Sequence, residues 1–174
     1  MDIEEFGNLI EQHGKALYGF CHRLTSNRTD TDDLYQETLL KAMEARYKLD
    51  RNRNPKAFLL SVAVGLHKNQ RRKFAWRQRI APTAAYKEAA AAINVVSSEE
   101  TPEAAVMSSE LRQKIQAAAD KLQDKLKIPL YLYYTAELSI EEIASVLQIP
   151  HGTVKSRLYQ ARQAMKKELE VESQ

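Results

Sequence analysis

The sequence predicts an all-α protein of two small helical domains joined by a flexible linker, with a helix-turn-helix in the C-terminal domain. Apolar residues recur at three- and four-residue steps along most of the 174 residues, and no alternation is long enough to build a sheet. Five glycines and five prolines are few turn-forming residues for a β fold with many turns. An Ala-, Ser- and Glu-rich stretch without apolar periodicity, residues 81–108, separates the predicted domains at 1–80 and 109–174.

Three helices are expected in the N-terminal domain, at about residues 6–24, 32–47 and 55–79. The apolar stripe from Phe6 to Leu24 defines the first, and it includes Cys21, which we expect to be buried. A polar turn at residues 25–30 separates the first two helices. Pro55 suits the first turn of the third helix, which is apolar on one side in its first half and cationic and aromatic in its second half.

Four helices are expected in the C-terminal domain, at about residues 110–122, 129–136, 140–147 and 153–169. Ser139 and Glu142 have the spacing of a capping box, which predicts a helix start at Ile140. Residues 148–152 then interrupt the pattern for a short turn only. The apolar seam of the last helix consists of Val154, Leu158, Ala161, Met165 and Leu169.

Charge is distributed unevenly along a chain whose net charge is only +3. Residues 51–87 carry ten basic side chains and no acidic one, and residues 143–167 form a second stretch without acids. Two separated basic blocks predict two contacts with one polyanion. Solvated helix faces, balanced by acids elsewhere in the fold, are the alternative for either block.

The sequence also predicts the cellular setting. A single cysteine, Cys21, cannot form a disulfide within the chain, which favours a reduced, cytoplasmic environment. The N-terminus is acidic where a secretory signal would be positive. We expect no membrane span, because no apolar run approaches the roughly 18 residues that one needs.

The outer face of the last helix suits a DNA major groove, since Arg and Lys can pair with guanine acceptors and Gln with adenine. A helical hairpin with a basic, solvated surface is the alternative. Residues 141–144 (EEIA) and 153–158 (TVKSRL) resemble the minus-35 recognition domain of extracytoplasmic-function (ECF) sigma factors, although Gln148 stands where that family usually has glycine. Within a helix-turn-helix at 140–167, the resemblance implies DNA contacts by Thr153, Lys155, Ser156, Arg157, Tyr159, Gln160 and Arg162.

Residues 32–42 (DDLYQETLLKA) resemble the helix with which the same family binds the clamp coiled coil of the polymerase core. The polar face of this helix, which the resemblance assigns to core-polymerase binding, consists of Asp33, Gln36, Glu37 and Lys41. A rival interpretation makes Asp33 and Glu37 metal ligands. Because no histidine or third carboxylate is placed to complete such a site, we expect no metal.

The third helix would then be the family's promoter-melting helix, which reads the minus-10 element. Its cations can neutralise phosphates, and its aromatic rings can stack on bases of single-stranded DNA. The alternative is that Phe74 and Trp76 are core residues. Gly65 departs from the family pattern, which has asparagine there. The residues expected to contact minus-10 DNA are Asn52, Asn54, Arg71, Arg72, Lys73 and Trp76.

These resemblances together imply an ECF sigma factor with three partners: the RNA polymerase core, promoter DNA and an anti-sigma factor, which in many relatives is membrane-bound. We expect no catalytic residue and no cofactor. A free-standing helix-turn-helix regulator would explain residues 139–169 equally well but not the two N-terminal motifs. An enzyme acting on nucleic acid is disfavoured, because the four histidines are scattered and no phosphate-binding glycine loop is present.

Overall fold

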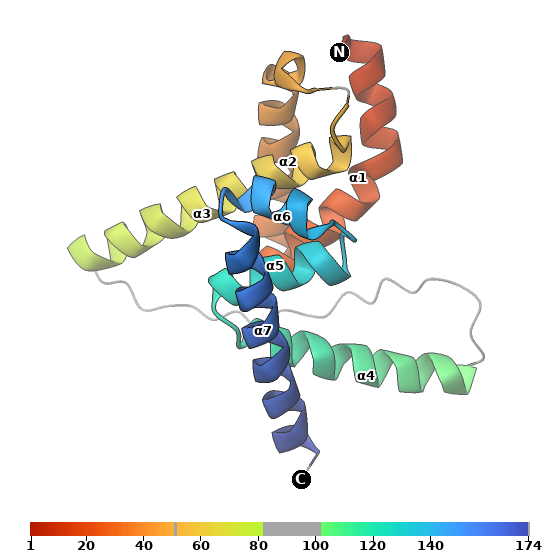
Figure 1. The fold of residues 1–174 in the computed structure, drawn as a ribbon, viewed down its shortest axis with the longest axis vertical. Helices are drawn as coiled ribbons and strands as arrows, with labels where there is room; N and C mark the ends of the chain where they lie inside the picture. The colour runs from red at the N-terminus through yellow and green to blue at the C-terminus, as the bar shows by residue number, and fades with distance from the viewer. Residues whose placement is uncertain (51, 82–101, 174) are drawn as a thin grey trace.

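The computed structural model describes residues 1–50, 52–81 and 102–173, and these residues are helical without any strand (Figure 1), which confirms the all-α prediction. A short 3-10 helix, η1, follows the second α-helix. The elements are α1 (Ile3–Thr25), α2 (Arg28–Glu44), η1 (Arg46–Lys48), α3 (Pro55–Ile80), α4 (Pro102–Asp120), α5 (Asp124–Tyr134), α6 (Ile140–Leu147) and α7 (His151–Glu172).

The N-terminal domain consists of α1, α2 and α3, which pack against one another. A capping box between Asp2 and Glu5 starts α1, and Cys21 is fully buried on its inner face as expected. The polar turn is shorter than predicted, because the Asn27 side chain accepts a hydrogen bond from the Asp30 backbone N–H and so starts α2 at Arg28. Tyr47 belongs to η1 and not to α2.

The C-terminal domain consists of α4 to α7, and two of its predicted helix starts are wrong. Helix α4 begins at Pro102 instead of residue 110, because proline suits the first turn of a helix. Helix α5 begins at Asp124 and contains Pro129. The buried neighbours Ile128 and Leu130 pack into the core, and this packing overrides the helix-breaking preference of the proline. The rest of the predicted linker, residues 82–101, lies outside the described residues.

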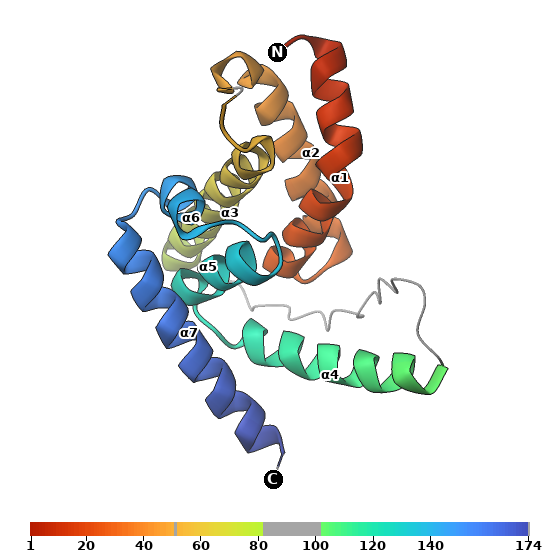
Figure 2. The same cartoon turned by 45° about the vertical axis from the view of Figure 1, so that its right-hand side comes forward.

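The two domains share one hydrophobic core. Phe20 and Leu24 of α1 belong to the same buried cluster as Ile128, Tyr131 and Leu132 of α5. Helix α6 packs against α3 and so adds to the junction between the domains. Helices α7 and α4 extend from this junction in different directions (Figure 2). The two domains therefore pack against each other, and we call this the closed arrangement. The sequence alone did not predict how the domains are placed relative to each other.

Gly65 lies exposed in the middle of α3, and a Cβ atom added there would meet no other atom within 4 Å. We expect Gly65→Ala to raise the free energy of unfolding by about 0.5–1 kcal/mol, because alanine is the better helix former. Urea unfolding followed by circular dichroism measures the change. Gly14→Ala is the control without such a gain, because its Cβ would lie 2.9 Å from the Tyr35 hydroxyl. A less stable Gly65→Ala protein would contradict a regular helix at this position.

Candidate nucleic-acid and polymerase interface

The C-terminal domain contains the predicted helix-turn-helix. Ser139 and Glu142 form the expected capping box, so α6 starts at Ile140. The turn is tighter than predicted, because α7 already begins at His151. Gln148 ends α6 in the left-handed conformation, with φ of 54°. This backbone conformation favours glycine, which is a physical reason for the glycine that the resembled family usually has at this position.

Helix α7 presents a polar and cationic outer face. Its inner seam is buried at Val154, Leu158 and Ala161, as the periodicity predicted. Thr153 and Arg157 are half-buried on the flank of the helix. The exposed side chains predicted to meet DNA are Lys155, Ser156, Tyr159, Gln160 and Arg162. The helix therefore offers hydrogen-bond donors and positive charge in the form that a major groove accepts.

The second half of α3 projects from the body of the molecule (Figure 1), and we call residues 68–80 its basic segment. Phe74 and Trp76 are 59% and 64% exposed, so the alternative that they are core residues is wrong. Trp76 lies one helical turn from Arg72 and from Lys73, and both cations are exposed. An exposed indole ring beside two cations can stack on a base while the neighbouring phosphates are neutralised.

The loop before α3 holds the two asparagines predicted to read minus-10 DNA. Asn52 is exposed. Asn54 is the N-cap of α3, because its side-chain oxygen accepts hydrogen bonds from the backbone N–H groups of Lys56, at 3.0 Å, and Ala57, at 3.4 Å. Its side-chain nitrogen donates to Glu142 Oε1 of α6 at 2.9 Å. In the closed arrangement both ends of the Asn54 amide are therefore occupied.

Charged groups meet at the junction of the domains. Buried His67 lies 3.1 Å from Asp124 Oδ2, and Arg71 Nε lies 3.4 Å from the same oxygen. The hydrogen bond with His67 is the main reason why the pKa of Asp124 is lowered. Burial, followed by repulsion from Arg157 of α7, lowers the pKa of Lys68. The junction thus combines an attractive pair of contacts with a repulsive pair of cations.

A carboxylate with a lowered pKa stabilises the fold above its unfolded-state pKa, and this contribution is lost as the pH falls through the folded-state pKa. We expect Asp124→Asn to lower the free energy of unfolding by about 1–2 kcal/mol at neutral pH, the value of a charge-assisted hydrogen bond. The difference between the variant and the wild type should shrink as the pH falls below the ordinary aspartate pKa of 3.8 and through the lowered pKa of folded Asp124. Urea unfolding across this pH range measures the difference. A deficit that is independent of pH would contradict the role of the charge.

The predicted polymerase-binding face lies on α2. Asp33, Gln36, Glu37 and Lys41 are exposed on this helix, and Glu37 accepts a hydrogen bond from Gln70 of α3 at 3.2 Å. The sequence interpretation missed the large apolar side chains that are exposed beside this polar face, which are Leu40, Met43 and Tyr47. Their spacing of three to four residues is the signal that could have identified them. Exposed apolar groups rimmed by polar ones are typical of a protein-binding surface.

Other kinds of site find no support in the described part of the chain. Across residues 1–50, 52–81 and 102–173, no three His, Cys, Asp or Glu side chains gather where they could hold a metal ion. No helix within these ranges is long and apolar enough to cross a membrane. Burial raises the pKa of Cys21 to about 12, which keeps this thiol protonated and unreactive.

A helix-turn-helix with an exposed cationic helix, combined with a second domain that carries a basic and aromatic helix, is typical of a DNA-binding protein. Family comparison agrees with this geometry. The model of Sigma-70 region 2 matches residues 9–78, and that of Sigma-70, region 4, matches residues 112–165. The two matched ranges contain α3 up to Gln78 and the start of α7, which carry the two exposed cationic surfaces.

The chain belongs to the ECF family of RNA polymerase sigma factors, which bind the core enzyme and direct promoter-specific initiation of transcription. It is 31% identical to ECF RNA polymerase sigma factor SigW of Bacillus subtilis over 169 residues, which are 97% of this chain and 90% of that protein. It is 33% identical to ECF RNA polymerase sigma-E factor of Escherichia coli over 171 residues, 94% of this chain and 86% of that protein. The family is not a class of enzymes.

Two solved structures share the fold. The sigma factor RpoE from Bartonella quintana, in complex with the anti-sigma factor NepR, superposes with a TM-score of 0.81 at 22% identity and covers 97% of this chain and 99% of its own. CnrH, in complex with the cytosolic domain of CnrY, gives a TM-score of 0.69 at 20% identity, with 98% and 90% covered. At these identities the likeness concerns the fold.

Proposed function

We propose that three surfaces of this sigma factor have separate roles in promoter recognition. The polar face of α2 binds the polymerase core, the basic segment of α3 captures the opened minus-10 strand, and the outer face of α7 reads the minus-35 duplex. The observation that carries this proposal is the exposure of Trp76 among cations on a helix whose first half is buried. An indole ring of a fold's own core would not be placed in solvent.

The α2 surface suits a protein partner better than a nucleic acid. It combines the carboxylates of Asp33 and Glu37 with exposed Leu40 and Met43, and carboxylates would repel a phosphate backbone. A coiled coil offers both apolar ridges and charged flanks. We infer that Gln36 and Lys41 complete the contact by hydrogen bonding to that partner.

The two DNA surfaces suit different states of DNA. The α7 face is a helix surface with Lys155, Tyr159 and Arg162 exposed, which fits the major groove of a duplex. On α3, the indole ring of Trp76 can stack on a base, and the neighbouring cations can contact phosphates. This combination fits an unstacked single strand better than the groove of a duplex. We propose that Asn52 and Asn54 contact the same strand from the loop that precedes α3.

Promoter binding would require the closed arrangement to open. Asn54 is bound to Glu142 at 2.9 Å, and Arg71 is paired with Asp124 at 3.4 Å, so two of the proposed DNA contacts are engaged across the domain junction. Opening would release both and relieve the repulsion between Lys68 and Arg157. We infer that the chain between α3 and α4, residues 81–101, connects the domains as a linker in the open state.

We infer further that the protein itself is not an enzyme, because RNA synthesis belongs to the polymerase core. The proposed partners, core polymerase and promoter DNA, place it in the cytoplasm. The solved structure of RpoE is a complex with the anti-sigma factor NepR, and that of CnrH is a complex with the cytosolic domain of CnrY. We propose that an anti-sigma factor, held at the membrane or free, restrains this protein in the same way.

Trp76→Ala should reduce binding of single-stranded minus-10 DNA by the protein with core about tenfold, because one base–aromatic stack contributes roughly 1–3 kcal/mol. Fluorescence anisotropy with a labelled non-template strand measures this loss. Trp76→Phe retains a stacking ring and is the control, with most of the affinity kept. Equal affinities for wild type and Trp76→Ala would remove Trp76 from the DNA site.

Footprinting of a selected promoter duplex tests the sigma-factor role against that of a free-standing regulator. The protein alone should protect the duplex weakly, and protein with core polymerase should protect both promoter elements. The minus-10 bases should also become reactive to a single-strand probe. Protection by the protein alone that core does not change would favour the regulator.

A further inference from the structure

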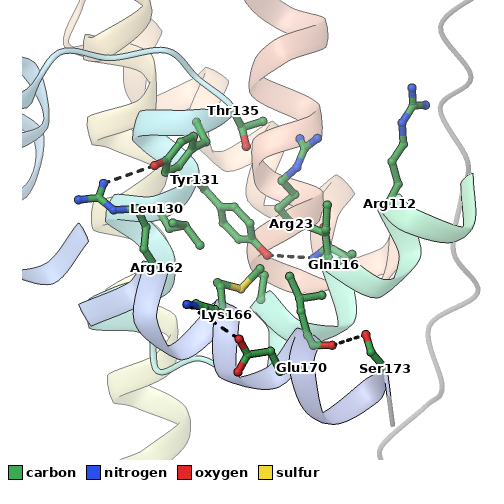
Figure 3. A pocket seen from close by; sticks show the side chains of 15 residues that line it. Arg23, Arg112, Gln116, Leu130, Tyr131, Thr135, Arg162, Lys166, Glu170 and Ser173 are labelled. Carbon is green, nitrogen blue, oxygen red and sulfur yellow. Dashed lines mark hydrogen bonds and ion pairs between the residues drawn. The ribbon is translucent and has the colours of Figure 1, made fainter. Parts of the chain in front are cut away.

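An open groove lies on the face formed by α1, α4, α5 and α7 (Figure 3). Its volume of about 1080 Å³ lies just above the range of about 300–1,000 Å³ that is usual for small-molecule sites. The hydrocarbon part of its lining comes from Ile115, Ala119, Leu130, Met165 and Leu169. Because these side chains offer no hydrogen bond, this part of the groove suits an apolar ligand or the apolar part of one.

Several polar side chains around this lining are already engaged with one another. The Tyr131 hydroxyl accepts a hydrogen bond from Gln116 Nε2 at 2.9 Å. Lys166 Nζ lies 3.9 Å from Glu170 Oε1. A ligand that lies along the groove therefore has no need of hydrogen-bonding groups along its whole length, and a plain hydrocarbon chain leaves these side chains satisfied.

Two guanidinium groups of the groove differ from these pairs. Arg23 and Arg112 line the groove, and neither forms an ion pair with a carboxylate among residues 1–50, 52–81 and 102–173. Arg162, by contrast, donates a hydrogen bond to the Tyr134 hydroxyl at 3.4 Å. Figure 3 shows Arg112 on one side of the groove and Arg162 on the other. Burial lowers the pKa of Arg23, which means that this cation is partly desolvated and would be stabilised by an anion.

We propose that this groove is a binding site for a long-chain fatty acid. The hydrocarbon chain would cover Ile115, Leu130 and Met165, and the carboxylate would pair with the guanidinium groups of Arg23 and Arg112. The planar fork of an arginine matches a carboxylate with two parallel hydrogen bonds. A ligand with one anionic end and a long apolar part fits this uneven distribution of polarity better than a nucleotide, which is polar along its length.

A ligand series on the full-length protein tests the match of chain and charge. Displacement of a dansyl-labelled undecanoate, followed by fluorescence, measures binding at concentrations at which no micelles form. Oleate should compete at least about tenfold better than oleyl alcohol, which has the same chain without a charge. Octanoate should compete at least about 100-fold less well than oleate, because each buried methylene strengthens binding about three- to fourfold. Equal competition by oleate and oleyl alcohol would overturn the proposal.

Variants locate the two ends of the ligand. Ile115→Glu places a carboxylate on the apolar lining and should weaken oleate binding about tenfold or more. The double variant Arg23→Gln, Arg112→Gln should lower the affinity for oleate to that for oleyl alcohol and leave oleyl alcohol unaffected. The matched controls are Leu111→Glu and Lys114→Gln, which change charge at exposed positions of α4 outside the groove. Both controls should bind oleate like wild type.

Ile115 is 42% exposed and Leu111 57%, so neither substitution removes core packing, and thermal unfolding verifies that each variant folds. Oleate should raise the Tm of wild type and not that of Ile115→Glu. Oleate binding that Ile115→Glu leaves unchanged would refute the site, because the chain would then lie elsewhere. Self-association that Ile115→Glu abolishes, without oleate binding, would assign the groove to a second copy. Because these measurements need neither polymerase nor DNA, their outcome is independent of the proposed function.

Discussion

Asp33→Lys is expected to reduce promoter-directed transcription about 100-fold while the fold stays intact. Asp33 is exposed on α2, so the new lysine disturbs no packing. In the complex it would reverse a charge in the proposed contact with core polymerase, and an unfavourable charge at an interface costs several kcal/mol. Run-off transcription and co-purification with core should therefore fail together, since the loss arises at assembly.

Glu11→Lys is the matched control for this prediction. Glu11 is exposed on α1, outside the proposed contact. Its replacement by lysine changes the charge by the same amount as Asp33→Lys does. Its transcription should equal that of the wild type. If Asp33→Lys assembled with core as well as Glu11→Lys does, the polar face of α2 would not be the polymerase-binding surface.

The double variant Lys155→Ala, Arg157→Ala should weaken binding to a minus-35 element by about 100-fold. Each contact of this kind to a base or a phosphate contributes roughly 1–3 kcal/mol. Arg157 lies near Lys68 in the closed arrangement, so its removal relieves a repulsion and should not destabilise the protein. Binding of holoenzyme to promoter duplexes with and without the minus-35 element measures the loss, which should be confined to the former.

Lys167→Ala controls for the loss of positive charge on α7. Lys167 is exposed on the same helix but lies about three turns from Lys155 and Arg157. Its removal should change promoter affinity little. Similar losses in Lys167→Ala and in the double variant would indicate general attraction to phosphates and no specific reading face.

Local sequence patterns predicted most of the fold and of the candidate surfaces. The capping box at Ser139 and the apolar seam of α7 are local features whose physical meaning does not depend on distant parts of the chain. The cationic and aromatic character of the basic segment of α3 is equally local. The sequence alone is therefore sufficient to assign such features to helices and to their faces.

What the sequence could not predict arises between distant segments. The hydrogen bond from Asn54 to Glu142 joins residues 88 positions apart, and the contact of His67 with Asp124 spans 57. The start of α5 five residues before Pro129 also depends on tertiary packing, since local rules place proline at a helix start. A groove lined by Arg23, Tyr131 and Met165 likewise brings together side chains of α1, α5 and α7, which are far apart in the sequence.

Run-off transcription with purified bacterial core polymerase on a library of promoter fragments, with and without this protein, tests the central claim most directly. We expect transcripts to start at a defined subset of sequences only when the protein is present, and these sequences to share a minus-35 and a minus-10 element. Transcription that is unaffected by the protein, while the protein alone protects duplex DNA, would contradict the account.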